Sequence, residues 1–174
     1  MSEKHTPQLR LGTVGWNRGF EAAGFYPEDL PEEWRLTYLS NELDCVLIPA
    51  ALLDSVDRET FEEWVEDTHE RFGFYTEEGG KQPSWVSELL GEQWLGNVSF
   101  EIVSDQALAA EGIDQLQIGN QVAVVEVAGE LSPMAMRKLL ERLKIDQVDT
   151  LLWQPGPGLV TNLSHAQTIA ALLG

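Results

Sequence analysis

Strand-like and helix-like segments alternate six times along this chain of 174 residues, and this alternation restricts its fold more than any other feature. Each apolar run typical of a buried strand is followed by a segment with helical spacing or helix-start residues. The expected strands span residues 9–14, 44–49, 72–76, 97–103, 121–129 and 147–153. Such alternation favours parallel strands, right-handed crossovers and helices packed outside the sheet.

The clearest expected helix begins after Asp57, a candidate N-cap. Its apolar stripe has intervals of three and four residues and consists of Phe61, Trp64, Val65, Thr68 and Phe72. Further helices are expected within residues 26–40, 85–94, 105–111, 134–144 and 164–173, with Ser104 as a cap of the third and Ser132 and Pro133 opening the fourth. Residues 116–121 leave a second possibility open, because their Gly-Asn pair suits a tight hairpin.

Chain length decides between the architectures that this pattern allows. A complete eight-unit barrel takes roughly 250 residues, more than this chain has. We therefore predict an α/β fold, an incomplete or reduced TIM-type (β/α) barrel of about six strand-helix units, with a parallel sheet and outer helices. An open doubly wound sheet is the alternative. Residues 1–8 are expected to form a flexible tail and residues 9–174 a single domain.

The charge of the chain excludes some classes of partner. The chain has 29 acidic and 11 basic residues, a formal net charge of −18 at pH 7. This charge repels nucleic acid and anionic membranes, so neither is expected as a partner. The acidic residues gather at helix starts, on helix faces and in turns, which serves solubility or adaptation to a saline host.

Apolar runs and cysteine content indicate the compartment. No run reaches the roughly 18 apolar residues of a membrane span, and the first residues lack the apolar core of a signal peptide. Cys45 is the single cysteine and lies within an apolar run, so we expect a buried small hydrophobe and no internal disulfide. These features predict a cytoplasmic protein.

A specific combination of motifs occupies the first part of the chain. A strand ends in a Gly-Thr-x-Gly-Trp turn, and a Phe-Tyr-Pro loop and a Glu-Trp helix follow. The residues concerned are Gly12, Thr13, Gly15, Trp16, Phe25, Tyr26, Pro27, Leu30, Glu33 and Trp34. This combination resembles the start of the YecE-like family, domain of unknown function 72. The resemblance implies a fold similar to triosephosphate-isomerase-type barrels, and no activity is securely attached to that family.

The resemblance also shows where this chain departs from the family. The family carries a Val-Glu-Ile-Asn run and a Phe-Tyr pair at the second strand, where this chain has "CVLIPAALL". Glu126 corresponds to an acidic strand residue of the family, but "VAGELSP" replaces the basic and aromatic residues expected after it. The comparison implies a short, divergent member that has lost polar side chains from its strand ends.

Ligands of parallel sheets sit at the carboxyl ends of the strands, so candidate site residues are sought there. The polar and aromatic residues at these ends are Trp16, Asn17, Arg18, Glu77, Glu78, Ser104, Asp105, Glu126, Glu130, Trp153 and Gln154. From these we predict that Trp16, Asn17, Arg18, Trp153 and Gln154 bind a ligand. The glycines around Trp16 would bring backbone N–H groups near an anion, and Arg18 would add charge. Alternatively, Gly12 and Gly15 only let the strand turn, with Trp16 capping the barrel.

Glu126 is the candidate catalytic residue. Strand alternation places it on the same side as Val122 and Val124, where desolvation would raise its pKa as a general acid or base requires. The alternative is a carboxylate at the strand end that reaches water or an arginine. Glu101 presents the same choice.

Other chemistry-bearing residues carry no site. His5, His69 and His165 are dispersed, so their spacing predicts no metal centre or catalytic pair. The "QPGPG" loop, residues 154–158, resembles a phosphate loop superficially, but its two prolines lack N–H groups, and a rigid turn is the better interpretation. No nucleophile elbow, Walker loop or dinucleotide fingerprint is present, and we expect no cofactor.

Two hypotheses about function follow. The first is a non-catalytic or activity-depleted module that binds either a small molecule or another protein. The small molecule expected is an anionic metabolite. The second is a barrel-type enzyme acting on a small phosphorylated or sugar-like metabolite, with Glu126 as acid or base and Arg18 as anion clamp. Because an incomplete barrel leaves open sheet edges, we also expect a homodimer that covers them.

Overall fold

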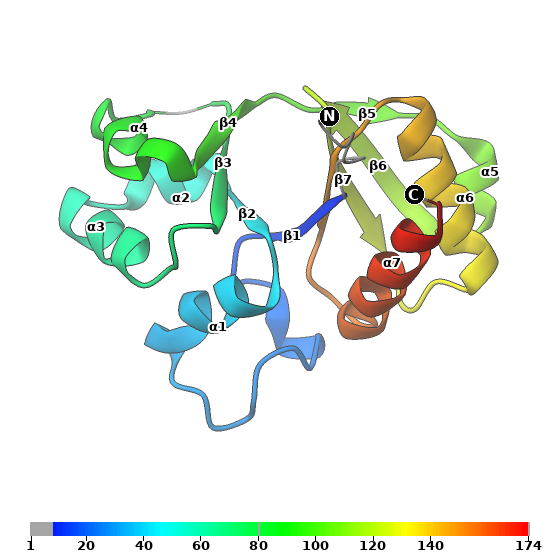
Figure 1. Cartoon of the computed structure of the whole chain (residues 1–174), viewed down its shortest axis with the longest axis horizontal. Coiled ribbons are helices and arrows are strands. Elements are labelled where there is room, and N and C mark those ends of the chain that lie inside the picture. The colour runs from blue at the N-terminus through cyan, green and yellow to red at the C-terminus, as the bar shows by residue number, and fades with distance from the viewer. Residues whose placement is uncertain (1–8, 80, 174) are drawn as a thin grey trace, which may run out of the picture.

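The computed structural model describes residues 9–79 and 81–173, and the predicted tail at residues 1–8 lies outside them. The strands are β1 (Arg10–Val14), β2 (Cys45–Ile48), β3 (Gly73–Glu77), β4 (Trp94–Val98), β5 (Glu101–Val103), β6 (Ile113–Gly119), β7 (Val122–Val127) and β8 (Thr150–Trp153). They form one curled sheet in the order β4-β3-β2-β1-β8-β7-β6-β5. The chain is thus an α/β fold with the shape of a half-barrel (Figure 1).

Seven α-helices and three short 3-10 helices connect the strands within the described residues. The α-helices are α1 (Arg35–Glu42), α2 (Ala50–Ser55), α3 (Arg58–Glu66), α4 (Trp85–Leu90), α5 (Gln106–Ala110), α6 (Pro133–Ile145) and α7 (Leu159–Leu173). The 3-10 helices are η1 (Phe20–Ala22), η2 (Glu32–Trp34) and η3 (Gly91–Gln93). No helix in the described part of the chain is both long and apolar enough to cross a membrane.

The sheet has eight described strands, and not the six parallel strands that were predicted. Residues 97–103 form the end of β4 and all of β5, and β6 is an additional strand that pairs antiparallel with both β5 and β7. The hairpin possibility at residues 116–121 is therefore the correct one. Asn120 and Gln121 both adopt positive φ, 46° and 69°, as a tight two-residue turn requires. The other strand pairs are parallel, as predicted.

The two faces of the sheet bury different sets of side chains. Leu11, Phe74, Val125 and Trp153 project to the face that packs against the helices. Their strand neighbours on the other face form a second, smaller cluster, which contains Cys45, Leu47, Tyr75, Val98, Val122, Val124 and Leu152. All four residues of β2 are buried, which explains its unbroken apolar sequence.

A hydrogen bond across the second face shows how strongly the sheet curls. Tyr75 on β3 and Thr150 on β8 lie 2.8 Å apart at their hydroxyl oxygens, although β2 and β1 separate their strands in the sheet. The edge strands β4 and β5 are joined by two residues, Ser99 and Phe100. Figure 1 shows β4 and β5 following one another across the top of the molecule. The curl thus lets the sheet cover its own inner face.

Helix starts follow the capping residues closely. The side chain of Asp57 accepts a hydrogen bond from Thr60 N, and that of Ser132 accepts one from Ala135 N, so both predicted caps are confirmed. The cap of α5 is Asp105, which accepts from Leu108 N, and not Ser104 as predicted. Helix α2 was not predicted, because its sequence continues the apolar run of β2.

The loop after β7 is held by a buried amide from α7. Asn162 is fully buried; its Oδ1 accepts from Leu131 N at 2.9 Å and its Nδ2 donates to the Gly129 oxygen at 3.1 Å. These contacts satisfy backbone groups that would otherwise be buried without partners. They join two segments that flank the carboxyl end of β8.

We predict that Asn162→Ala lowers the free energy of unfolding by about 2 kcal/mol, because it leaves a buried N–H and a carbonyl without partners. Chemical denaturation followed by circular dichroism measures this change. Gln167→Ala, which removes an exposed amide from the same helix, is the control and should change stability by less than about 0.5 kcal/mol. Equal effects of the two substitutions would contradict the role given to Asn162.

Asp105 joins α5 to α6. Its carboxylate caps α5 at Leu108 N and also pairs with Arg142 on α6, which in turn pairs with Asp146. The backbone hydrogen bond from Leu108, helped by the guanidinium of Arg142, lowers the pKa of Asp105 below its ordinary value of 3.8. A lowered pKa in the folded state adds stability above the unfolded pKa, and that stability is lost as the pH falls through the folded value.

Asp105→Asn keeps a good cap but removes the ion pair, so we expect it to destabilise the fold by up to about 1 kcal/mol at neutral pH. The difference from wild type should vanish once the pH lies below the lowered pKa of Asp105, since the carboxylate is then protonated. Denaturation midpoints of both proteins from pH 7 downward measure this. A difference that stays constant with pH would exclude the charge as its cause.

Candidate functional site

The candidate site is a pocket at the carboxyl ends of β1, β2 and β8. Because β7, β8, β1 and β2 are parallel neighbours, the loops that follow them meet at one edge of the sheet. The pocket has a volume of about 620 Å³, within the range of small-molecule sites. Its lining comprises Val14, Gly15, Trp16, Asn17, Arg18, Gly19, Pro49, Ala51, Leu52, Ser55, Gln154 and Pro155. Four of the five predicted ligand-binding residues thus line one pocket.

The pocket differs in charge from the rest of the molecule. Arg18 is the one charged residue among the described residues that line it, although the chain has a net charge of −18. Arg18 is exposed, and no described carboxylate lies within ion-pair distance of it, whereas Arg58 and Arg137 each pair with one and Arg142 pairs with two. The lining therefore offers an uncommitted cation that an anion can reach.

The loop from Gly15 to Gly19 is shaped by its own short contacts. Gly15 adopts a φ of 68°, which lets the chain turn away from β1, and its N–H donates to the Leu47 oxygen on β2 at 2.9 Å. The hydroxyl of Thr13 donates to the Gly15 oxygen at 2.8 Å. The hydroxyl of Tyr26 donates to the Trp16 oxygen at 2.6 Å.

This loop keeps several donors uncommitted. Its carbonyls accept hydrogen bonds, but within the described chain no group accepts from the backbone N–H groups of residues 16–19. Asn17 Oδ1 accepts from Arg35 Nη1 at 3.2 Å, and Asn17 Nδ2 has no acceptor among the described residues. The side-chain amide of Gln154, at the other side of the pocket, is likewise without a described partner. The polar part of the pocket is rich in donors.

The apolar side of the pocket comes from the segment after β2. Pro49, Ala51 and Leu52 lie at the start of α2, and Ser55 is its last residue. Glu77 at the end of β3 holds this helix, because its carboxylate accepts from Ala50 N at 2.9 Å. Glu77 was considered as a site residue, and its contact shows that it positions the pocket wall.

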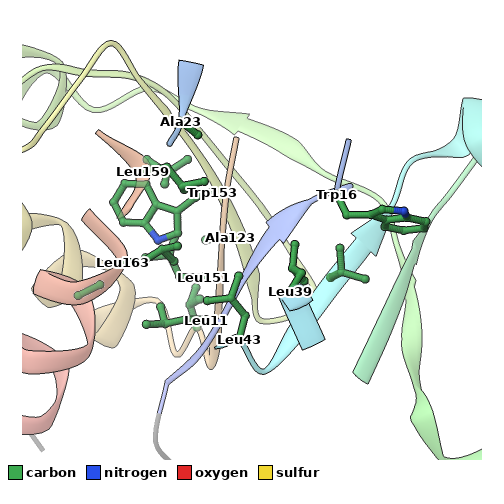
Figure 2. Close-up of a cluster of buried hydrophobic side chains, with 14 of the residues drawn as sticks. Leu11, Trp16, Ala23, Leu39, Leu43, Ala123, Leu151, Trp153, Leu159 and Leu163 are labelled. Atoms are coloured by element: carbon green, nitrogen blue, oxygen red, sulfur yellow. The ribbon is translucent and has the colours of Figure 1, made fainter. Parts of the chain in front are cut away.

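The two predicted tryptophans are buried. Trp16 is 5% exposed and its ring meets that of Trp64 edge to face, with the centroids 4.8 Å apart. Trp153 is fully buried on the helix-covered face, and Figure 2 shows its indole beside Leu159 and Leu163. Trp153 is absent from the pocket lining, and its indole nitrogen has no partner among the described residues. The structure thus separates Trp153 from Arg18.

The acidic candidates also lie outside the pocket. Glu126 follows Val122 and Val124 on the inner face, but at the strand end it is exposed and therefore not desolvated. Glu130 accepts a hydrogen bond from the Thr161 hydroxyl at 3.0 Å, and Glu78 and Glu101 are exposed. The structure brings Arg18 and Gln154 together and leaves Glu126 apart from them.

A second pocket, of about 370 Å³, lies between α5 and β6. Its lining includes Asp105, Asp114 and the half-buried Val103. The two carboxylates make this pocket unsuited to an anion. Among the described residues, no three histidine, cysteine or acidic side chains are grouped closely enough to hold a metal ion.

Sequence reasoning missed the residues that support the site from behind. Tyr26 and Arg35 occur in the motif region, but nothing in their spacing relates them to Trp16 and Asn17. The wall from α2 was missed as well, although Pro49 followed by Ala and Leu is a helix-start signal that was available. The roles of Tyr26, Arg35 and α2 depend on contacts between segments far apart in the chain, which local sequence patterns do not predict.

Comparison with known proteins gives one match. Residues 10–77 match the family described as "Protein of unknown function DUF72". No curated protein and no solved structure matches the chain. The matched segment runs from the first residue of β1 to the last residue of β3 and contains the loop and helix that form most of the pocket lining. Over residues 10–77 the predicted resemblance to the DUF72, or YecE-like, family is confirmed.

Proposed function

We propose that this protein is a non-catalytic module that binds a small anionic metabolite in the pocket at the ends of β1, β2 and β8. The observation that carries the proposal is the lining: an unpaired Arg18, free amide and N–H donors, and no acidic residue among the described lining residues of a strongly acidic protein. An arginine and unpaired N–H donors, with no carboxylate beside them in the lining, favour a ligand that carries oxygen acceptors and negative charge.

The apolar wall indicates the rest of the ligand. Pro49, Ala51 and Leu52 face the same space as Arg18 and Asn17. A ligand that fits both sides has a phosphate or carboxylate at one end and a body with C–H surface, such as a sugar ring.

We place the protein in the cytoplasm, since its single thiol, Cys45, is buried and unpaired.

The enzyme hypothesis has less support. It requires Glu126 to act on a ligand that Arg18 holds, and Glu126 does not line the Arg18 pocket. The resemblance implies polar residues at the second strand, where this chain has the apolar run "CVLIPAALL". This run gives binding surface without an acid or base.

We expect Arg18→Met to weaken ligand binding without changing the fold. The test is a thermal-shift screen of glycerol 3-phosphate, glucose 6-phosphate and AMP, with Kd values from calorimetry for those that stabilise. Loss of a charge-assisted contact should weaken binding by about tenfold or more. The melting temperature without ligand should not change, because Arg18 is exposed and has no described partner.

Arg137→Met is the matched control, because it makes the same charge change on an exposed arginine of α6 that does not line the pocket. It should bind as wild type does. Glu126→Gln should also retain binding. Loss of binding in this variant would favour the enzyme hypothesis. Failure of every ligand to stabilise wild type would contradict the proposed function.

A homodimer is a separate proposal that concerns the sheet edge. The short strand β5 pairs with β6, and no pairing on its other side occurs within the described residues, where Ile102 is 68% exposed. Pairing of two β5 edges would cover this side chain. Sedimentation at micromolar concentration should then show dimers that Ile102→Lys converts to monomers. Monomers in the wild-type protein would remove this proposal.

A further inference from the structure

Arg35 deepens the proposed function, on which the following inference rests. It lies in the first turn of α1, behind the loop that carries Asn17 and Arg18. Its Nη1 donates to Asn17 Oδ1 at 3.2 Å. Arg35 is half-buried and, like Arg18, has no carboxylate within ion-pair distance among the described residues.

The contact between Arg35 and Asn17 sets the orientation of the amide. An arginine side chain has donors and no acceptor, so the amide must turn its oxygen toward Arg35. The other half of the amide, Nδ2, then remains for the pocket that Asn17 lines. An amide without this constraint offers a ligand its donor or its acceptor with equal ease.

Tyr26 in turn holds Arg35. The guanidinium carbon of Arg35 lies 5.4 Å from the centre of the Tyr26 ring, a cation–π distance. The Tyr26 hydroxyl donates to the Trp16 oxygen, next to Asn17 in the chain. Burial raises the pKa of Tyr26, so this hydroxyl stays protonated and keeps its role as a donor. Tyr26 of the Phe-Tyr-Pro loop therefore contacts both Arg35 and the loop that carries Asn17.

We propose that Arg35 is a positioning residue that makes Asn17 a hydrogen-bond donor to the ligand and so restricts the pocket to oxyanions. Asn17 Nδ2, the Arg18 guanidinium and the N–H groups of residues 16–19 act on the same group, a phosphate or a carboxylate. A neutral amide or alcohol would leave the charge of Arg18 unused. Arg35 also adds a second positive charge behind the site.

Two variants test this proposal with glycerol 3-phosphate and glycerate as probes, which represent the phosphate and the carboxylate. Arg35→Met frees the amide to rotate. Asn17→Asp keeps a partner for Arg35 and so preserves the fold, but it turns a carboxylate oxygen toward the ligand. Arg137→Met is again the control, because it removes the same charge as Arg35→Met at a position outside the pocket. Calorimetry gives each Kd, and the side-chain amide signal of Asn17 in a nitrogen-15 NMR spectrum reports the contact directly.

The expected result is a shift of the Asn17 amide signal on binding, a Kd about tenfold weaker for Arg35→Met, and no measurable binding for Asn17→Asp. Preference between the two probes identifies the oxyanion. If Arg35→Met binds as Arg137→Met does, or if Asn17→Asp binds as wild type does, the role of Arg35 is overturned while the proposed function stands. If wild type binds neither these probes nor the panel used for Arg18, the proposed function itself fails.

Discussion

The pairing of β1 with both β2 and β8 is the interaction on which the rest of this structure depends. It brings the first of the described strands beside the last and places β1 at the centre of the sheet. The approach to β2 needs Gly12, because a Cβ atom there would lie 2.2 Å from the Cys45 carbonyl oxygen. A larger residue would force the two strands apart and remove the edge at which the pocket forms.

The same pairing explains why the family motif has a role in this chain. Gly12 permits the strand contact, Gly15 permits the turn, and the Phe-Tyr-Pro loop supplies the ring that holds Arg35. The motif thus builds the loop of residues 15–19, in which carbonyl oxygens accept hydrogen bonds and the backbone N–H groups of residues 16–19 have no described acceptor. The residues opposite this loop in the pocket come from α2 and its N-cap Pro49, and from Gln154 and Pro155.

The curl of the sheet separates buried core residues from residues that line the pocket. Side chains that point to the helices or into the curl, such as Trp153 and Tyr75, are buried and hold the layers together. Residues just beyond the strand ends, such as Arg18 and Gln154, reach the open edge. Trp153, one residue before Gln154, therefore belongs to the core, because successive side chains along a strand point to opposite faces of the sheet.

The sequence by itself determined the α/β class, most strand positions, the caps at Asp57 and Ser132, and the edge at which Arg18, Asn17 and Gln154 meet. These depend on local signals: apolar runs, capping side chains and glycine turns act within a few residues of one another. The tertiary structure decided that β6 runs antiparallel, that α2 forms a pocket wall, that Trp153 is buried and that Arg35 holds Asn17. Each of these depends on contacts between segments far apart in the chain, and an apolar run does not encode the direction or identity of its partner.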